Sequence, residues 1–339
     1  MSATNQRKHA HLRTFARDPQ VERGKHYFDA IRLTHRALPE LALAEVDPTA
    51  EFLGQRLSFP LLISSMTGGS EQIFRTINRN LALAAEAEGV ALGVGSQRVM
   101  FSEPASVKSF ELRQLAPSVP LLANLGAVQL NCGFGLNECR AAIDVLKADA
   151  LILHLNPLQE AIQLEGDTNF RGLAGKLGVL ARKLHTPVIV KEVGAGLSLA
   201  DAQLLVKHGI RWLDVAGAGG TSWSRVEHHS RIAAGDDLGL VFQDWGLPTP
   251  QALAALHPLR KQVKLIASGG IRNGLDMAKA IVLGAHLCGV AAPFLQPAQE
   301  SAAAVRAVIQ RFRREFTTAL FLLGCPTVAA ARGNVRLLA

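Results

Sequence analysis

The stretch KLIASGGIR, Lys264–Arg272, is an apolar run that ends in two glycines. A run that is apolar throughout, rather than alternating with polar residues, is typical of a strand covered on both faces. Glycines directly after such a strand let backbone N–H groups approach a phosphate closely. A buried strand followed by a phosphate-binding turn is typical of the later strands of a (β/α)₈ barrel.

Seven further runs are short and apolar and end in small or polar residues. They are Leu61–Ser65, Ala91–Gly95, Leu121–Asn124, Ala150–His154, Val188–Lys191, Trp212–Ala216 and Leu287–Ala291. The first four runs along the chain begin roughly 30 residues apart, which is about the length of one βα unit. Eight such runs predict an α/β fold, a TIM (β/α)₈ barrel. No GxGxxG motif follows the first run, which argues against an open dinucleotide-binding sheet.

Helical patterns separate the predicted strands. In the segments 73–81, 170–184 and 305–323, apolar residues recur every three or four positions, which predicts helices with one buried face. Residues 1–56 precede the barrel of residues 57–339. We expect them to form an N-terminal extension with a short helix near 5–17 that caps one end and contributes to the active site. The stretch 223–248 after the sixth strand exceeds an ordinary connection and is expected to be a lid or a partner contact.

The chain is basic, with a formal net charge of +8. Such an excess suits an anionic ligand, a nucleic acid or an acidic surface, and a solvated basic surface explains it equally well. The basic clusters have no interleaved aromatic residues and the chain has a single Tyr, so we expect no nucleic-acid partner.

Four cysteines, Cys132, Cys139, Cys288 and Cys325, lack the spacing of a metal site and are expected to be free thiols in a reducing compartment. The first residues lack the apolar core of a signal peptide, and no apolar run approaches the roughly 18 residues of a membrane span. We therefore expect a cytoplasmic protein with no membrane partner.

The residues after the strands of such a barrel gather on one rim, where barrel enzymes have their active sites. The candidates on this rim are Ser65, Met66, Thr67, Gly68, Ser96, Gln97, Arg98, Asn124, His154, Asn156, Gln159, Glu160, Lys191, Thr221, Trp223, Gly269, Gly270, Ile271, Arg272, Ala291 and Ala292. A barrel with only a structural role would not need so many polar groups there.

Three features of the rim point to anion chemistry. Gly269-Gly270 before a helix predicts a phosphate site, although a βα turn can need glycine for its backbone angles alone. Arg98 suits forked phosphate contacts. Glu160 near a phosphate suits Mg²⁺, which takes one or two protein oxygens, and it equally suits a plain helix N-terminus.

Lys191 ends the fifth strand, where an unpaired cation is costly. Three partners are open from the sequence: an electron-rich flavin edge, a substrate carbonyl that forms a Schiff base, or the neighbouring Glu192.

Together the motifs resemble the FMN-dependent type 2 isopentenyl-diphosphate isomerases. The matching strings are RKHAHL (7–12), SMTGG (65–69), GSQR (95–98), HLNPLQE (154–160), KEVG (191–194), AGAGGTSW (216–223) and SGG (268–270). The resemblance implies a 1,3-proton shift between isopentenyl and dimethylallyl diphosphate, with FMN in its reduced form, Mg²⁺, and NAD(P)H as reductant. It also implies a homo-oligomer, a tetramer or an octamer.

The resemblance assigns roles to individual residues. It implies catalytic roles for Gln159, His154, Trp223 and Glu227, with N5 of the flavin as the acid–base group. It implies substrate contacts from Arg7, Lys8, His11, Ser96, Gln97, Arg98, His154, Asn156 and Gln159, and a metal contact from Glu160. It implies FMN contacts from Ser65, Met66, Thr67, Gly68, Ser96, Asn124, Lys191, Thr221, Gly269, Gly270, Ile271, Arg272, Ala291 and Ala292.

Two other functions fit parts of the pattern. An FMN-dependent 2-hydroxy acid dehydrogenase or oxidase would share the barrel and the phosphate site, but it needs a His base and an arginine pair, and AGAGGTSW after the sixth strand has neither. A non-catalytic basic barrel that binds RNA or a protein would account for the charge but would be colourless.

Overall fold

Eight parallel strands close into a barrel in the computed structural model, which describes residues 3–230 and 235–339. Around the barrel the strands are β3 (Leu61–Ile63), β4 (Ala91–Gly93), β5 (Leu121–Gly126), β6 (Ala150–Leu155), β7 (Val188–Glu192), β8 (Trp212–Asp214), β9 (Lys264–Ser268) and β10 (Leu287–Val290). β10 pairs with β3 and closes the ring. The predicted TIM barrel is confirmed, and each predicted run overlaps one barrel strand.

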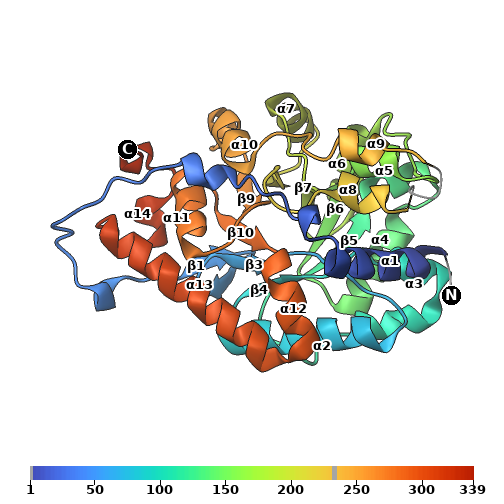
Figure 1. Ribbon diagram of the computed structural model, residues 1–339, viewed down its shortest axis with the longest axis horizontal. Helices are drawn as coiled ribbons and strands as arrows, with labels where there is room; N and C mark the ends of the chain where they lie inside the picture. The colour runs from blue at the N-terminus through green and yellow to red at the C-terminus, as the bar shows by residue number, and fades with distance from the viewer. Residues whose placement is uncertain (1–2, 231–234) are drawn as a thin grey trace.

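Helices surround the barrel (Figure 1). They include α2 (Gln72–Glu88), α4 (Leu136–Leu146), α6 (Leu173–Lys183), α7 (Leu199–Lys207), α10 (Thr249–Ala255), α11 (Gly274–Val282), α12 (Ala292–Glu300), α13 (Ala302–Leu322) and α14 (Val328–Ala331). The helices predicted at 73–81, 170–184 and 305–323 correspond to α2, α6 and α13. The long α13 packs against α2, α11 and α12.

The barrel interior is a small apolar core distinct from the layer between strands and helices. Leu62, Leu122 and Ile152 belong to it, and so do Phe52 and Leu57. The last two come from a hairpin of β1 (Ala50–Phe52) and β2 (Gln55–Leu57), which directly precedes the first barrel strand. The hairpin therefore closes the amino-terminal end of the barrel.

The first part of the N-terminal extension, residues 3–23, crosses the opposite end, whereas residues 33–47 run beside the C-terminal part of the chain. Helix α1 (Ala3–Arg17) contacts α8 (Trp223–His228), and residues 21–23 run antiparallel to residues 220–222. Ser222 N donates to Val21 O at 2.7 Å and Arg23 N donates to Gly220 O at 3.1 Å. The extension thus covers both ends of the barrel, rather than the one end expected from sequence.

The segment after β8 forms α8 and α9 (Leu238–Val241) and packs beside α5 (Pro157–Ile162). Residues 231–234 of the expected 223–248 insertion lie outside the described residues. Within the described ranges, no helix combines the length and the apolar character that crossing a membrane requires.

Candidate active site

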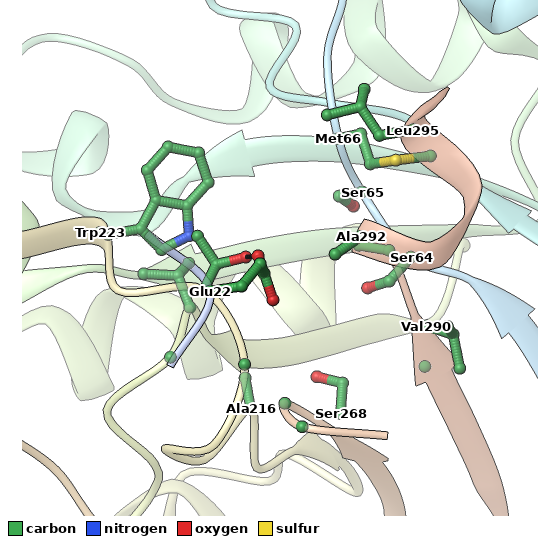
Figure 2. A pocket seen from close by; sticks show the side chains of 18 of the residues that line it. Glu22, Ser64, Ser65, Met66, Ala216, Trp223, Ser268, Val290, Ala292 and Leu295 are labelled. Atoms are coloured by element: carbon green, nitrogen blue, oxygen red, sulfur yellow. Dashed lines mark hydrogen bonds between the residues drawn. The ribbon is translucent and has the colours of Figure 1, made fainter. Parts of the chain in front are cut away.

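A cavity of about 570 Å³ opens at the carboxyl ends of the barrel strands, beneath α1. Most of the predicted site residues line it: Arg7, Lys8, His11, Ser65, Met66, Thr67, Ser96, Asn124, His154, Gln159, Lys191, Thr221, Trp223, Gly269, Gly270, Ile271, Arg272, Ala291 and Ala292. Figure 2 shows Trp223 on one side of this cavity and Met66 and Leu295 on another. The structure thus brings together residues from α1 and from all eight strand ends. Six of the predicted residues do not line the cavity.

Two of those six lie behind the cavity wall. Gln97 is fully buried, donates to Ala142 O at 2.9 Å and accepts from Asn124 N at 3.0 Å. It supports Asn124. Gly68 packs against the Phe110 ring, where an added Cβ would lie 2.3 Å from the ring carbons. The structure therefore places Gln97 and Gly68 outside the cavity lining, and their ligand contacts stay predictions.

Arg98 also stays outside the lining because a carboxylate holds it. Its Nη1 lies 2.9 Å from Oδ2 of Asp167, which also accepts from Gln129 Nε2 at 2.9 Å. Burial opposes ionisation of Asp167, but the bonds from Gln129 and Arg98 outweigh it and hold the pKa below its usual value. Asp167 was missed at the sequence level, and its position seven residues after Glu160 gave no signal.

The predicted metal residue, Glu160, is buried and already hydrogen-bonded at both oxygens. Asn156 Nδ2 donates to Oε1 at 2.8 Å and Asp167 N donates to Oε2 at 2.7 Å. Asn156 thus positions Glu160 through this hydrogen bond and does not itself line the cavity. Within the described residues, no three His, Cys, Asp or Glu side chains are grouped to hold a metal ion. A Mg²⁺ ion here would need ligand and water oxygens besides Glu160.

Gln159, Glu227 and His11 form a connected group at the mouth of the cavity. Gln159 Nε2 donates to Glu227 Oε1 at 2.7 Å, and His11 Nε2 lies 3.2 Å from the same oxygen. The Glu227 side chain is fully buried. Burial would raise its pKa, but the hydrogen bonds from His11 and Gln159 lower it overall. The Trp223 ring packs edge-on against His11 at 5.4 Å between centroids.

His154 is neutral in this environment. Burial, reinforced by the nearby Lys191 charge, lowers its pKa to about 4. Its Nδ1 lies 2.8 Å from Asn124 Oδ1, and Asn124 Nδ2 donates to Val94 O at 3.0 Å, which fixes the amide so that Nδ1 is the protonated nitrogen. Nε2 is then an acceptor, so His154 lines the cavity as a neutral ring.

Lys191 is paired with a residue that the sequence left unassigned. Its Nζ lies 3.3 Å from Asp214 Oδ2 and bonds to Ser268 Oγ at 3.2 Å and Glu192 O at 2.9 Å. Ser268 Oγ donates to Asp214 Oδ1 at 2.6 Å. The only signal for Asp214 was a charged residue inside an apolar run. Of the three partners considered, the neighbouring Glu192 contributes only its backbone oxygen.

Lys8 joins α1 to the strand-end loops. Its Nζ donates to Gly68 O and, at 2.9 Å, to Ser96 O. Burial, with the adjacent Arg7, lowers the pKa of Lys8 to about 7. The Lys8 side chain, at the edge of the cavity, therefore gains or loses its positive charge near neutral pH.

The glycine turn after β9 forms a backbone cradle. Gly269 and Gly270 have φ values of 93° and 77°, and a Cβ on Gly269 would lie 2.0 Å from Gly217 O. Ala292 and Pro293, at the start of helix α12, line the same cavity, and the N-terminal end of a helix favours an anion. Arg272 lines the same end but pairs with Asp29 at 2.8 Å and Asp276 at 3.1 Å.

The cavity fits FMN. The cradle suits the phosphate, and Met66 and Leu295 offer apolar contacts for a ring (Figure 2). Ser65 Oγ is a buried polar atom with no hydrogen-bond partner among the described residues. A ligand polar group at Ser65 would remove the cost of leaving that atom unsatisfied.

Solved structures resemble the fold. A mandelate oxidase variant with an FMN adduct matches with a TM-score of 0.64 and 19% identity, over 92% of this chain and 88% of that chain. A flavocytochrome b2 variant with pyruvate bound matches with a TM-score of 0.67 and 17% identity, over 92% of this chain and 76% of that chain. At this identity the likeness concerns the barrel architecture alone.

Sequence relatives are much closer. The family described as FMN-dependent dehydrogenase matches residues 163–336. Isopentenyl-diphosphate delta-isomerase of Paracoccus zeaxanthinifaciens is 57% identical over 98% of this chain and 96% of the relative. The proteins of that name from Hydrogenovibrio crunogenus and a Nostoc species are 55% and 49% identical, over 97% and 95% of this chain and 96% and 92% of theirs. The chain belongs to the isopentenyl-diphosphate delta-isomerase family, in its FMN-dependent type 2 form.

Proposed function

We propose that this protein interconverts isopentenyl diphosphate and dimethylallyl diphosphate, with reduced FMN, Mg²⁺, and NAD(P)H as the source of electrons. One observation carries the proposal. A single cavity combines a glycine cradle for one phosphate with the basic Arg7 and Lys8 at its edge, in a chain 57% identical to a protein of that name. Two anion-binding ends and an apolar middle suit a flavin phosphate and a small alkenyl diphosphate together.

The substrate end is supported by charge. Arg7 and protonated Lys8 would hold the diphosphate, and Ser96 adds a hydroxyl group in the same lining. Glu160 would hold Mg²⁺ against the diphosphate, in exchange for one of its two hydrogen bonds. His154, as a neutral acceptor, would orient a donor such as a metal-bound water.

The chemistry requires protonation of an unactivated alkene away from water. Reduced FMN, when bound, supplies an electron-rich face and a ring nitrogen that exchanges protons. Gln159 would lie beside the alkene, and the ionised Glu227 with His11 Nε2 would hold a proton at the cavity mouth. Trp223 and Met66 would shield the cationic carbon from solvent.

Backbone groups and a positive charge support FMN binding at the other end of the cavity. The cradle Gly269-Gly270 with Ile271, Arg272, Ala291 and Ala292 would hold the FMN phosphate. Ser65, Thr67, Asn124 and Thr221 would bond the rest of the cofactor, and the paired Lys191 would keep a positive charge beside the electron-rich ring.

We further propose a homo-oligomer, a tetramer or an octamer, in the cytoplasm. Its support is the exposed apolar surface beside α9, where the side chains of Val241 and Trp245 are 74% and 62% exposed. Neighbouring exposed apolar side chains suit contact with a second copy, and Leu238 and Leu247 are exposed in the same segment. Sedimentation equilibrium at several concentrations measures the assembly, and a monomer throughout would contradict it.

The decisive experiment is anaerobic incubation of the protein with isopentenyl diphosphate, FMN, NADPH and Mg²⁺. Dimethylallyl diphosphate should form, and omission of the reductant should abolish its formation. An FMN-loaded, reduced protein that forms no dimethylallyl diphosphate would overturn the proposal. NADH in place of NADPH then tests the preferred reductant.

A further inference from the structure

A carboxylate that the proposed mechanism does not use points into the same cavity. Glu22 lies in the N-terminal extension and lines the cavity with Thr221. Figure 2 shows its side chain directed into the space between Trp223 and Ser64. Its sequence neighbours Arg23 and Gly24 gave no motif, so sequence analysis left it unassigned.

The backbone holds Glu22 in place. Residues 21–23 pair with 220–222, and Glu22 forms the bridge partner of Thr221. The next side chain, Arg23, is buried and donates to Gly194 O and Gln243 O at 2.9 Å, and to Trp245 O at 3.3 Å. Arg23 points away and is anchored to the loop after β7 and the loop after α9. The neighbouring Glu22 side chain points the other way, into the cavity.

Only half of this carboxyl group has a partner among the described residues. Oε1 bonds with the Thr221 hydroxyl, and Oε2 has no hydrogen-bond donor there. Burial raises the pKa of Glu22, with the Thr221 bond and the Arg23 charge acting against that rise. A further donor at Oε2 would stabilise the ionised form, and a ligand in the cavity is the available source.

The place of Glu22 along the cavity indicates which ligand group it meets. Gly220, next to Thr221, packs on the phosphate cradle, since a Cβ there would lie 2.8 Å from Gly270 N. Three further residues proposed to contact the rest of the cofactor lie elsewhere in the barrel: Thr67 in the loop after β3, Asn124 in β5 and Lys191 in β7. A carboxylate would repel the phosphate itself. The hydroxyl chain between the FMN phosphate and its ring supplies donors, and a carboxylate is an acceptor-only group.

We propose that Glu22 is a cofactor-binding residue whose carboxylate accepts a hydrogen bond from a hydroxyl group of the FMN ribityl chain. The inference rests on the proposed use of FMN. It also gives the N-terminal extension a second role, because the segment that carries substrate-binding basic residues on α1 then contacts the cofactor as well.

The test is FMN affinity of the full-length protein, measured by quenching of flavin fluorescence. Glu22→Ala should raise the Kd for FMN about tenfold, the usual cost of losing a hydrogen bond to a charged group. Glu22→Gln retains an acceptor oxygen and should raise it less than about threefold. Glu51→Ala, an exposed glutamate at the opposite end of the barrel, is the matched control and should leave the Kd unchanged.

Deoxy analogues of FMN locate the contact. With one of the 2′-, 3′- and 4′-deoxy analogues, wild type and Glu22→Ala should bind equally, because the partner hydroxyl is already absent. An unchanged Kd for FMN in Glu22→Ala, or a tenfold loss that persists with every deoxy analogue, would overturn the inference. Wild-type protein without FMN affinity would instead contradict the proposed function. Thermal unfolding of each variant separates lost folding from lost binding.

Discussion

The ammonium of Lys191 lies 3.3 Å from Asp214 Oδ2, at facing positions of the adjacent strands β7 and β8. Both side chains are buried, and Ser268 bonds to both. A Schiff-base lysine needs a free amine to attack a carbonyl, whereas Nζ of Lys191 is already engaged by Asp214, Ser268 and the Glu192 carbonyl. The geometry therefore supports a fixed positive charge toward the cofactor and argues against a Schiff base with a substrate carbonyl.

Removing the charge of Asp214 should destabilise the protein. Asp214→Asn keeps the shape but leaves the Lys191 charge buried and unpaired, so the free energy of unfolding should fall by about 3 kcal/mol. Urea unfolding measures it. Asp144→Asn, on the exposed face of α4, should stay within about 0.5 kcal/mol of wild type. Equal stability of the two variants would mean that the Lys191–Asp214 pair contributes nothing.

Lys8 should make substrate capture depend on pH near neutrality. Its pKa is about 7, so the ammonium is present below that pH and lost above it. We expect kcat/KM for isopentenyl diphosphate to fall above pH 7 in wild type. Lys8→Arg stays charged, and the fall should move to higher pH or disappear. An identical pH profile in both proteins would remove Lys8 from diphosphate binding.

The sequence could predict what depends on local pattern. Continuous apolar runs at βα spacing identified all eight barrel strands, and the glycine turn after β9 identified the cradle, because the left-handed φ values of Gly269 and Gly270 suit glycine. It could not predict which side chains pair across strands. The Lys191–Asp214 contact depends on the register of β7 with β8, which no short stretch encodes.

The same limit explains the misplaced residues. The string GSQR lies in the turn after β4, where Ser96 lines the cavity and Gln97 is buried in the wall. Arg98 is held by Asp167, about 70 residues further along the chain. Glu22 reaches the cavity only because residues 21–23 pair with 220–222. Such long-range contacts are set by the folded chain and have no signature in a single sequence.

The phosphate cradle should not tolerate a side chain at Gly269. In Gly269→Ala the Cβ would meet Gly217 O at 2.0 Å, at a φ that alanine rarely adopts. FMN should be lost from the purified protein, with at most a small fraction of the wild-type flavin absorbance near 450 nm. Gly175→Ala, inside α6 with its nearest neighbour atom at 3.9 Å, should keep the wild-type flavin content. Full flavin in Gly269→Ala would place the phosphate elsewhere.

Gln159 should matter for turnover but not for cofactor binding. Gln159→Ala removes the donor to Glu227 Oε1 and leaves the rest of the cavity wall intact. We expect a fall in kcat of about 100-fold or more, as for loss of a group engaged in proton transfer, with an unchanged Kd for FMN. Rapid-quench assays and flavin titration give the two values. Near-wild-type kcat would count against a position beside the alkene.

Glu160 provides the last test, since its role depends on a metal ion. Both of its oxygens accept hydrogen bonds from Asn156 and Asp167 N, so the carboxylate is held rigidly and a bound ion would replace one of these donors. Glu160→Gln keeps the shape and loses the charge, and a hard cation such as Mg²⁺ strongly prefers the charged oxygen. The Mg²⁺ concentration for half-maximal activity should therefore rise at least tenfold, while the FMN Kd stays unchanged. Asn156→Ala should raise it less, because Asn156 positions the carboxylate without supplying its charge. A Mg²⁺ titration of Glu160→Gln that overlays the wild-type curve would assign the metal to other groups.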